Sequence, residues 1–339
     1  MPVFVRGMTR STLGNLNAAT RVNVTKPEFR SVTGQTTEGT PLALNRQPDQ
    51  RLRPWVGRSM VAYAFASSNV EVAGQLCNDS AYLRCAVGVD WVAGTADGPL
   101  DIRDETFLCG QHSKVMPLTY RGGIKVAGLM LRPGALYALF GVLDEEMVDR
   151  IRSVEVAGIS DTIVTGLYSP GMEPDQWLLA LEEWLVDHVH TNAIAPPDQL
   201  AQAIELQAFA DPSIGLRDFA DRQGVSVRTV ERVALRDFGL SPKQIMRRAR
   251  ILDSAAQLCG VADTEEEEEF FLRYFDQAHR IREFHAYFGM TPRQFQHSRS
   301  GLLTLSLEIR QARRLEMLDR IKPDAVRPWM RRPFALAQD

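Results

Sequence analysis

The first half of the chain alternates short runs of β-branched and aromatic residues with polar, turn-rich segments. Ser, Asn, Asp and Gly dominate the segments between the runs. The runs predict strands at 60–66, 70–77, 82–92, 106–109, 114–120 and 124–131. Strands at this spacing, joined by polar turns, favour an antiparallel sandwich or barrel, with a cupin-like barrel as one form.

After Pro133 the hydrophobic period lengthens towards that of a helix. Short helices are expected over 133–141 and 144–151, and a longer one over 173–190, where the apolar residues fall on one stripe. Such a stripe is typical of core packing, with a dimer contact as the alternative. Residues 191–198 (TNAIAPPD) have no period and contain a Pro-Pro pair, which predicts a linker between domains.

Residues 213–238 have the layout of a helix-turn-helix. Phe219 and Ala220 lie on the apolar face of a short helix, Gly224 suits the turn, and Ser226 can cap a second helix. That second helix has its own apolar stripe and carries arginines on the other face. An exposed arginine near the start of such a helix can pair bidentately with guanine in the major groove. A charged surface helix in an ordinary bundle is the alternative.

A second helix-turn-helix is expected further along the chain. A third helix begins at Ser241-Pro242, and Thr291-Pro292 repeats the same cap after a helix over 277–288. Residues 301–321 form one more amphipathic pattern. We expect that helix to pack on the second unit, with a dimer or polymerase contact as the alternative.

Composition suits about two domains, because 339 residues with 45% hydrophobic and 24% charged side chains can bury two cores. The net charge of −3 hides an uneven distribution, since residues 216–250 hold nine basic side chains against four acidic ones. This basic window favours a nucleic-acid partner. Apolar runs are too short to span a bilayer and the N-terminus lacks a signal-peptide pattern, so a cytoplasmic location without membrane contact is expected.

Several other classes of protein are disfavoured. The four cysteines form no CxxC pair, which argues against zinc and disulfides, although redox sensing by Cys77, Cys85 or Cys109 stays open beside the interpretation of inert buried thiols. His112 is the sole histidine in the first 187 residues, which argues against a metal-dependent barrel. Nucleophile-elbow and phosphate-loop motifs do not occur. We therefore expect no metal, no cofactor, no catalytic residue and no enzymatic activity.

Two segments of the C-terminal half resemble the DNA-binding domain of the XylS/AraC family of bacterial transcriptional regulators. They are GVSVRTVERVALRDFGLSPKQIMRRARI (224–251) and YFDQAHRIREFHAYFGMTPRQF (274–295), which match in order and spacing. More weakly, VAGLMLRPGALYALFGV (126–142) is similar to the β-rich regulatory domain of some members. The resemblance implies an α+β multidomain protein. Its parts would be a β-rich regulatory or dimerisation domain (1–190), a linker (191–198), a double helix-turn-helix domain (199–298) and a helical extension (299–339).

The resemblance also implies roles for individual residues and for partners. Base-reading side chains would be Arg228, Thr229, Glu231, Arg232, Gln277, His279 and Arg282. Phosphate contacts would come from Arg236, Lys243, Arg247, Arg248 and Arg293. The implied partners are double-stranded DNA, RNA polymerase, a second copy of the chain, and a small-molecule or protein effector at the N-terminal domain. Activation is the commoner mode in this family.

The second unit departs from the family pattern. Arg273 stands where a glycine is usual, Arg280 replaces a buried apolar residue, and Glu265–Glu269 would repel a phosphate backbone. We therefore expect either that the first unit dominates specificity or that the acidic run engages a protein partner. A helix-turn-helix adaptor or antagonist that acts through protein contacts is the alternative function.

The β-rich half offers one candidate ligand pocket. Its lining would be Trp55, Tyr63, Tyr82 and Trp91. Aromatic residues on strands are more often core than pocket.

Overall fold

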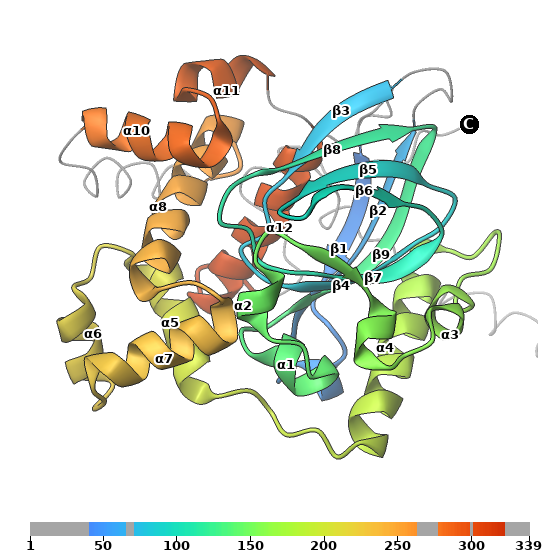
Figure 1. Cartoon of the computed structure of the whole chain (residues 1–339), viewed down its shortest axis with the longest axis horizontal. Coiled ribbons are helices and arrows are strands. Elements are labelled where there is room, and N and C mark those ends of the chain that lie inside the picture. The colour runs from blue at the N-terminus through green and yellow to red at the C-terminus, as the bar shows by residue number, and fades with distance from the viewer. Residues whose placement is uncertain (1–40, 66–70, 263–276, 299–300, 323–339) are drawn as a thin grey trace, which may run out of the picture.

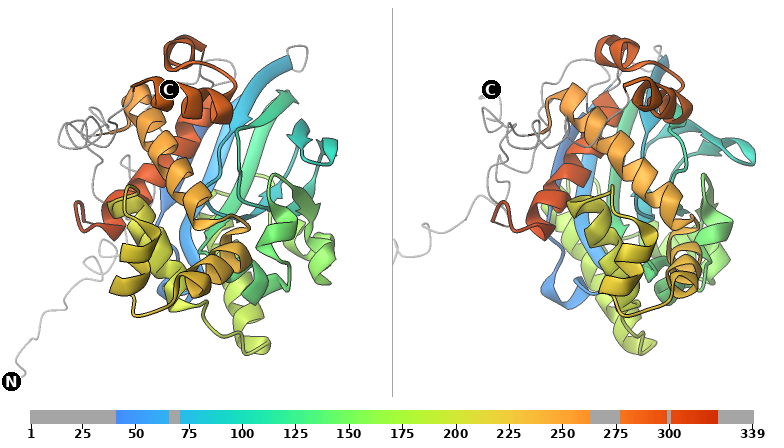
Figure 2. Two further views of the ribbon diagram at one scale, coloured as in Figure 1. Left: turned by 60° about the vertical axis from the view of Figure 1, so that its left-hand side comes forward. Right: turned by 90° about the vertical axis from the view of Figure 1, so that its left-hand side faces the viewer.

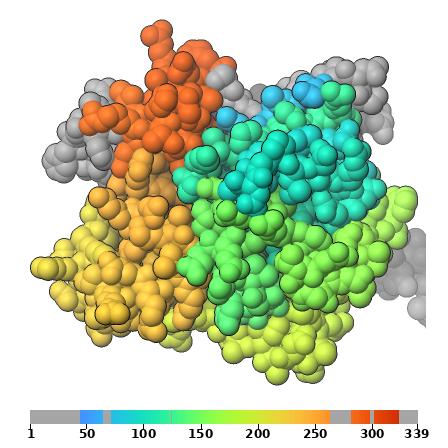
Figure 3. Space-filling view, viewed as in Figure 1, coloured from blue at the N-terminus to red at the C-terminus, as the bar shows by residue number. Residues whose placement is uncertain are grey.

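A computed structural model describes residues 41–65, 71–262, 277–298 and 301–322 (Figure 1). Two parts lie side by side, a β-rich part formed by the first half of the chain and a helical part formed by the second. Figure 3 shows their surfaces in contact along most of one side, with the helical part in yellow and orange. In this described portion, no helix is both long and apolar enough to cross a membrane.

Within the described residues the strands form two antiparallel sheets. The six-stranded sheet has the order β1 (Pro41–Arg46), β2 (Val56–Phe65), β9 (Gly123–Leu131), β4 (Tyr82–Ala86), β7 (Glu105–Cys109) and β10 (Ile151–Ser153). The four-stranded sheet has the order β3 (Glu71–Leu76), β8 (Met116–Arg121), β5 (Asp90–Thr95) and β6 (Gly98–Ile102).

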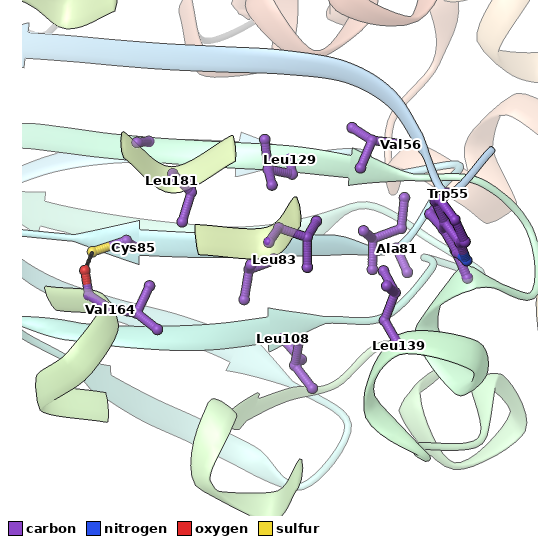
Figure 4. Close-up of a cluster of buried hydrophobic side chains, with 14 of the residues drawn as sticks. Trp55, Val56, Ala81, Leu83, Cys85, Leu108, Leu129, Leu139, Val164 and Leu181 are labelled. Atoms are coloured by element: carbon purple, nitrogen blue, oxygen red, sulfur yellow. Dashed lines mark hydrogen bonds between the residues drawn. The ribbon is translucent and has the colours of Figure 1, made fainter. Parts of the chain in front are cut away.

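Alternation along the strands separates two apolar clusters. On β4, Leu83 and Cys85 face one cluster, whereas Tyr82 and Ala86 face the other. The first cluster is covered by helices on the outer face of the six-stranded sheet, and Figure 4 shows its side chains. The second fills the space between the two sheets. Because successive strand residues point to opposite faces, one strand supports both layers.

In the described part of the chain, four α-helices accompany the sheets. They are α1 (Ala135–Phe140), α2 (Asp144–Met147), α3 (Asp161–Thr165) and α4 (Pro174–Thr191). The stripe expected on α4 is core packing, since Trp177, Leu178 and Leu181 are fully buried. Asp175 and Glu182 of the same helix are also buried and pair with Arg46 of β1, at 2.7 and 2.8 Å. These ion pairs fix α4 against the edge of the sheet.

Some expected elements differ from those observed. The run at 82–92 is two strands, because the chain crosses from the six-stranded to the four-stranded sheet between Ala86 and Asp90. The segment between the expected strands at 82–92 and 106–109 contains a further strand, β6, which is joined to β5 by the two residues between Thr95 and Gly98. Strands β1 and β10 were not expected, and α2 ends at Met147, earlier than predicted.

The helical part contains, in its described residues, two groups of helices joined by α8 (Pro242–Cys259). The first group is α5 (Gln199–Ala210), α6 (Leu216–Arg222) and α7 (Val227–Phe238). The second group is α10 (Gln277–Phe288) and α11 (Pro292–Ser298). Figure 2 shows the two groups at opposite ends of α8.

Helix α12 (Gly301–Met317) lies between the two parts of the molecule (Figure 2). Leu302, Leu305 and Ile309 enter the cluster between the sheets. Leu303 and Leu307, on another side of the helix, enter the cluster formed with α8, α10 and α11. The expected packing on the second unit is therefore present, but the same helix also packs on the β-rich part.

Buried charged side chains of α12 pair with both parts of the molecule. Arg310 contacts Asp79 of the β-rich part and Asp253 of α8, each at 2.7 Å. Arg313 forms a bidentate pair with Glu205 of α5 at 2.7–2.9 Å. Because these charges are shielded from water, their pairing depends on all the elements staying together.

Candidate nucleic-acid interface

Helices α6 and α7 form the helix-turn-helix that the sequence predicts. Ser226 caps α7, since its hydroxyl accepts a hydrogen bond from the Thr229 N–H at 3.1 Å. The apolar contacts between the helices come from one buried cluster, whose members on α6 and α7 are Phe219, Ala220, Val230, Val233, Ala234 and Phe238. Packing of this stripe fixes which face of α7 is turned to solvent.

The solvent face of α7 carries most of the predicted base-reading residues of the first unit. Arg228, Glu231 and Arg232 are exposed. Thr229 is half-buried, and its hydroxyl lies 2.9 Å from the Ser226 hydroxyl. Recognition helices contact bases with their N-terminal residues, which is where these side chains stand.

Three of the predicted phosphate contacts are accessible to different degrees. Lys243 is exposed at the start of α8, and Arg293 is exposed on α11. Arg247 is half-buried and pairs with Glu283 of α10 at 3.3 Å.

Arg236, another predicted phosphate contact, forms ion pairs with two carboxylates of the protein itself. It contacts Asp198 at 2.9 Å and the buried Asp237 at 2.5 Å. These two partners raise the pKa of the Arg236 guanidinium. A phosphate contact by Arg236 would require exchange of these partners.

Arg248 does not stand at the surface, which corrects the expectation of a phosphate contact. It is 5% exposed and donates to the backbone oxygens of His112 and Asp79, at 3.1 and 2.9 Å. A third bond, of 2.7 Å, goes to the Gln111 side chain. Burial in this contact lowers the pKa of Arg248. Its role in this conformation is to join α8 to the β-rich part.

The second unit repeats the cap of the first. The Thr291 hydroxyl accepts a hydrogen bond from the Gln294 N–H, as Ser241 does from Gln244 at the start of α8. Helix α8, which joins the two units, has 18 residues and is therefore about 27 Å long.

The base-reading residues expected from the second unit are only partly described. Arg282 is exposed on α10. The side chains of Gln277, His279 and Arg280, and the whole of Glu265–Glu269 and Arg273, lie outside the described residues.

The C-terminal end of α7 contacts the β-rich part, a feature that sequence reasoning missed. The Asp237 backbone oxygen accepts hydrogen bonds from the Gly134 N–H at 3.2 Å and from the Gln111 side chain at 3.4 Å. Gly239, the cap of α7, lies against the Asp144 backbone of α2. Burial, and next the nearby Asp237, raise the pKa of the Asp144 carboxyl well above its usual value.

Residues 219–298 match the family model of a helix-turn-helix domain. This part of the chain is a helix-turn-helix domain. The match begins in α6 and ends with α11. It therefore includes both helix-turn-helix units and leaves α12 outside. No curated protein sequence matches the chain significantly.

Solved structures of AraC-like regulators show low similarity to this chain. Fatty-acid-bound ToxT from Vibrio cholerae is 12% identical, with 79% of this chain and 99% of ToxT covered and a TM-score of 0.42. An apo ToxT variant from the same organism is 10% identical, with 78% and 99% covered and a TM-score of 0.41. The AraC-like transcriptional activator CuxR is 11% identical, with 63% and 87% covered and a TM-score of 0.28. Likeness at this level does not bear on what the present chain binds.

The four aromatic residues that the sequence offered as the lining of one ligand pocket lie in two different places. Trp55 and Tyr63 pack with the outer cluster, and the Trp55 indole donates to the Ala195 backbone oxygen at 3.1 Å. Tyr82 and Trp91 line a small cavity between the sheets.

The cysteines and potential metal ligands complete the description. Cys77, Cys85, Cys109 and Cys259 are buried, and burial raises the pKa of the Cys85 thiol to about 11. A thiol in that state is a poor nucleophile near neutral pH. In the described ranges no group of three or more His, Cys, Asp or Glu side chains could hold a metal ion.

Proposed function

We propose that this protein is a bacterial, cytoplasmic transcription factor whose helix α7 reads a specific DNA sequence. The observation that carries the proposal is the division of α7 into two faces. Val230, Val233 and Ala234 are at most 1% exposed, whereas Arg228 and Arg232 lie in solvent. Readout of the major groove requires arginines at the start of the second helix of the unit, on its solvent face. An arginine that only increased solubility could lie anywhere on the surface.

The docking of α7 on the β-rich part is compatible with this function. It uses residues 237–239 at the end of the helix and leaves the first turns exposed. Lys243 and Arg293 would position the duplex through phosphates, together with Arg247. Arg282 would contribute a base contact from the second unit.

The β-rich part is the proposed site of control, through an effector that changes how the helical part presents α7. Its contacts with α7 and α8 support this assignment, since a structural change in the β-rich part would alter the contacts that it makes with Arg248 and Gly239. RNA polymerase and a second copy of the chain are the proposed protein partners.

Selection from a random double-stranded DNA library tests the function. We expect the wild-type protein to enrich one motif, and Arg228→Ala/Arg232→Ala to lose that enrichment. Arg103→Ala/Arg121→Ala is the matched control, because both side chains are exposed arginines of the β-rich part, each paired with one carboxylate. If the wild type enriches no motif and binds DNA only weakly in a salt-sensitive way, the adaptor alternative replaces this proposal.

A further inference from the structure

A cavity of about 390 Å³ lies inside the first helix-turn-helix unit. Its walls come from α5, α6, α7 and α8, and from the segment that joins α5 to α6. Among the lining side chains, Ile204, Phe219 and Val230 are at most 2% exposed, whereas Ile214 and Leu216 are half-buried. A typical ligand pocket has several hundred Å³, and a dry apolar cavity of about 150 Å³ already binds benzene. This cavity is therefore large enough for two fused six-membered rings.

The lining of the cavity is mostly apolar, and its polar members are already engaged or exposed to water. Eight of the eleven lining residues are apolar. The Ser213 hydroxyl donates to the Asp211 carboxylate. Nη1 of Arg250 donates to the Pro212 backbone oxygen at 2.8 Å, and Nη2 lies 3.8 Å from the Glu283 carboxylate. A ligand in this cavity therefore needs no charge and no buried hydrogen-bonding group.

One wall of the cavity has groups that favour an aromatic ring over an aliphatic one. Lys243, Met246 and Arg250 line the cavity from α8 at positions i, i+3 and i+7, which lie on one face of a helix. An ammonium or guanidinium group is attracted to the face of an aromatic ring, and a methionine sulfur also makes favourable contacts with rings. Phe219 of α6 adds a ring that can pack edge-to-face. An aliphatic molecule gains none of these contacts.

We propose that this cavity binds a neutral, fused-ring aromatic molecule. The Lys243 ammonium lies over one ring, and the rest of the molecule packs on Met246 and Phe219. An organic anion fits less well, because Lys243 is exposed, where a charge pair contributes little, and Arg250 already has its own partners. This site goes beyond the proposed function, which places control in the β-rich part.

Occupation of the cavity has a consequence for DNA binding. Lys243 is one of the proposed phosphate contacts, and a ring that holds its ammonium competes with a phosphate for it. Val230, on the buried face of the proposed reading helix α7, also lines the cavity. The ligand and DNA should therefore weaken each other's binding by the same factor. This consequence rests on the proposed function, whereas the binding of the aromatic molecule does not.

Calorimetric titration of the full-length protein with 2-naphthol and decahydro-2-naphthol tests the binding. The two probes share one carbon skeleton and one hydroxyl, and only the first is aromatic. We expect 2-naphthol to bind one-to-one with a Kd on the order of 0.1 mM. Decahydro-2-naphthol should bind about tenfold more weakly, because it lacks the contacts of a ring face with Lys243 and Met246.

Three variants locate the site. Ile214→Trp should fill the cavity with its indole and weaken 2-naphthol binding at least about tenfold. Leu206→Trp is the matched control, because Leu206 is a 42% exposed apolar residue of the same unit that does not line the cavity, and it should bind as the wild type does. Lys243→Gln should weaken 2-naphthol binding about threefold and leave that of decahydro-2-naphthol unchanged.

Nuclear magnetic resonance of methyl-labelled methionines gives a second, independent readout. The Met246 methyl signal, assigned by its loss in Met246→Leu, should move upfield when 2-naphthol binds, because the methyl group lies against a ring face. No saturable binding of 2-naphthol, equal binding of the two probes, wild-type affinity of a folded Ile214→Trp, or an unmoved Met246 signal would each overturn the proposal. If Ile214→Trp fails to fold, the Met246 signal decides.

Fluorescence anisotropy with a labelled DNA duplex at low salt tests the consequence for DNA binding. Saturating 2-naphthol should weaken DNA binding by the wild type about threefold, and by Lys243→Gln not at all. Equal DNA affinity of the wild type with and without 2-naphthol would refute the coupling. The calorimetric measurement involves no DNA, so this site and the proposed function can fail separately.

Discussion

Replacing Gly239 by alanine tests the docking of α7 on the β-rich part. Gly239 has φ of 65°, and a Cβ there would lie 2.6 Å from the Asp144 backbone oxygen and 2.5 Å from Val148 Cγ2. Gly260, the cap of α8, has φ of 72° and nothing within 4 Å of the same position. Gly260→Ala is therefore the matched control for the backbone conformation.

The magnitudes follow from these two environments. Alanine in the left-handed region costs roughly 1–2 kcal/mol, which both variants share. Gly239→Ala adds overpacking against a backbone atom of α2, worth about 1–3 kcal/mol more. Urea unfolding followed by circular dichroism gives both free energies. Equal destabilisation by the two variants would refute the inference that α7 is packed tightly on α2.

Three further predictions concern buried ionisable side chains. Arg313→Met should lower the free energy of unfolding by about 3–5 kcal/mol in urea titrations, because Glu205 is left buried without its partner. The double variant Arg313→Met/Glu205→Met should recover most of that loss. An equal loss in the double variant would contradict the prediction. Burial lowers the pKa of His112 from 6.5 to about 4, so at mildly acidic pH the unfolded chain binds a proton that the folded chain does not, and the free energy of unfolding falls as pH drops. Between pH 7 and pH 5 the wild type should lose about 2 kcal/mol through His112. His112→Gln should not show this part of the loss. The pKa of the Asp144 carboxyl is raised in the fold, so its contribution to the free energy of unfolding is lost as pH rises above 3.8. Asp144→Asn should therefore raise the free energy of unfolding at pH 8 and raise it much less near pH 4. No gain at pH 8 would contradict the raised pKa.

Local signals made the first helix-turn-helix predictable. Its caps and apolar stripe lie within 26 consecutive residues, from Ser213 to Phe238, so propensity and period indicate the same helices. The exposure of Arg228 and Arg232 follows from the same period, because the stripe fixes the opposite face.

The partners of buried arginines could not be predicted in the same way. Arg248 and Arg310 stand among other arginines on amphipathic helices, a pattern typical of a solvent face. Their partners lie far away in the sequence, at Gln111 and Asp79. Tertiary pairing therefore determines the burial of these side chains, and with it the placement of α12 between the two parts.

The division of the β-rich half into two sheets was also only partly predictable. Residues 82–92 read as one run, since hydrophobic alternation does not record which sheet a strand joins. The crossing between Ala86 and Asp90 is a long-range outcome of pairing with β7 and β8.

Base-by-base readout tests the central claim, that α7 reads DNA sequence, most directly. The measurement is competition binding of the wild type, Arg232→Ala and Lys243→Ala to every single-base variant of the selected motif. We expect Arg232→Ala to lose preference at one position, by about 1–3 kcal/mol, and Lys243→Ala to weaken binding evenly at all positions. If Arg232→Ala also weakens binding evenly and leaves every base preference intact, α7 does not read the sequence.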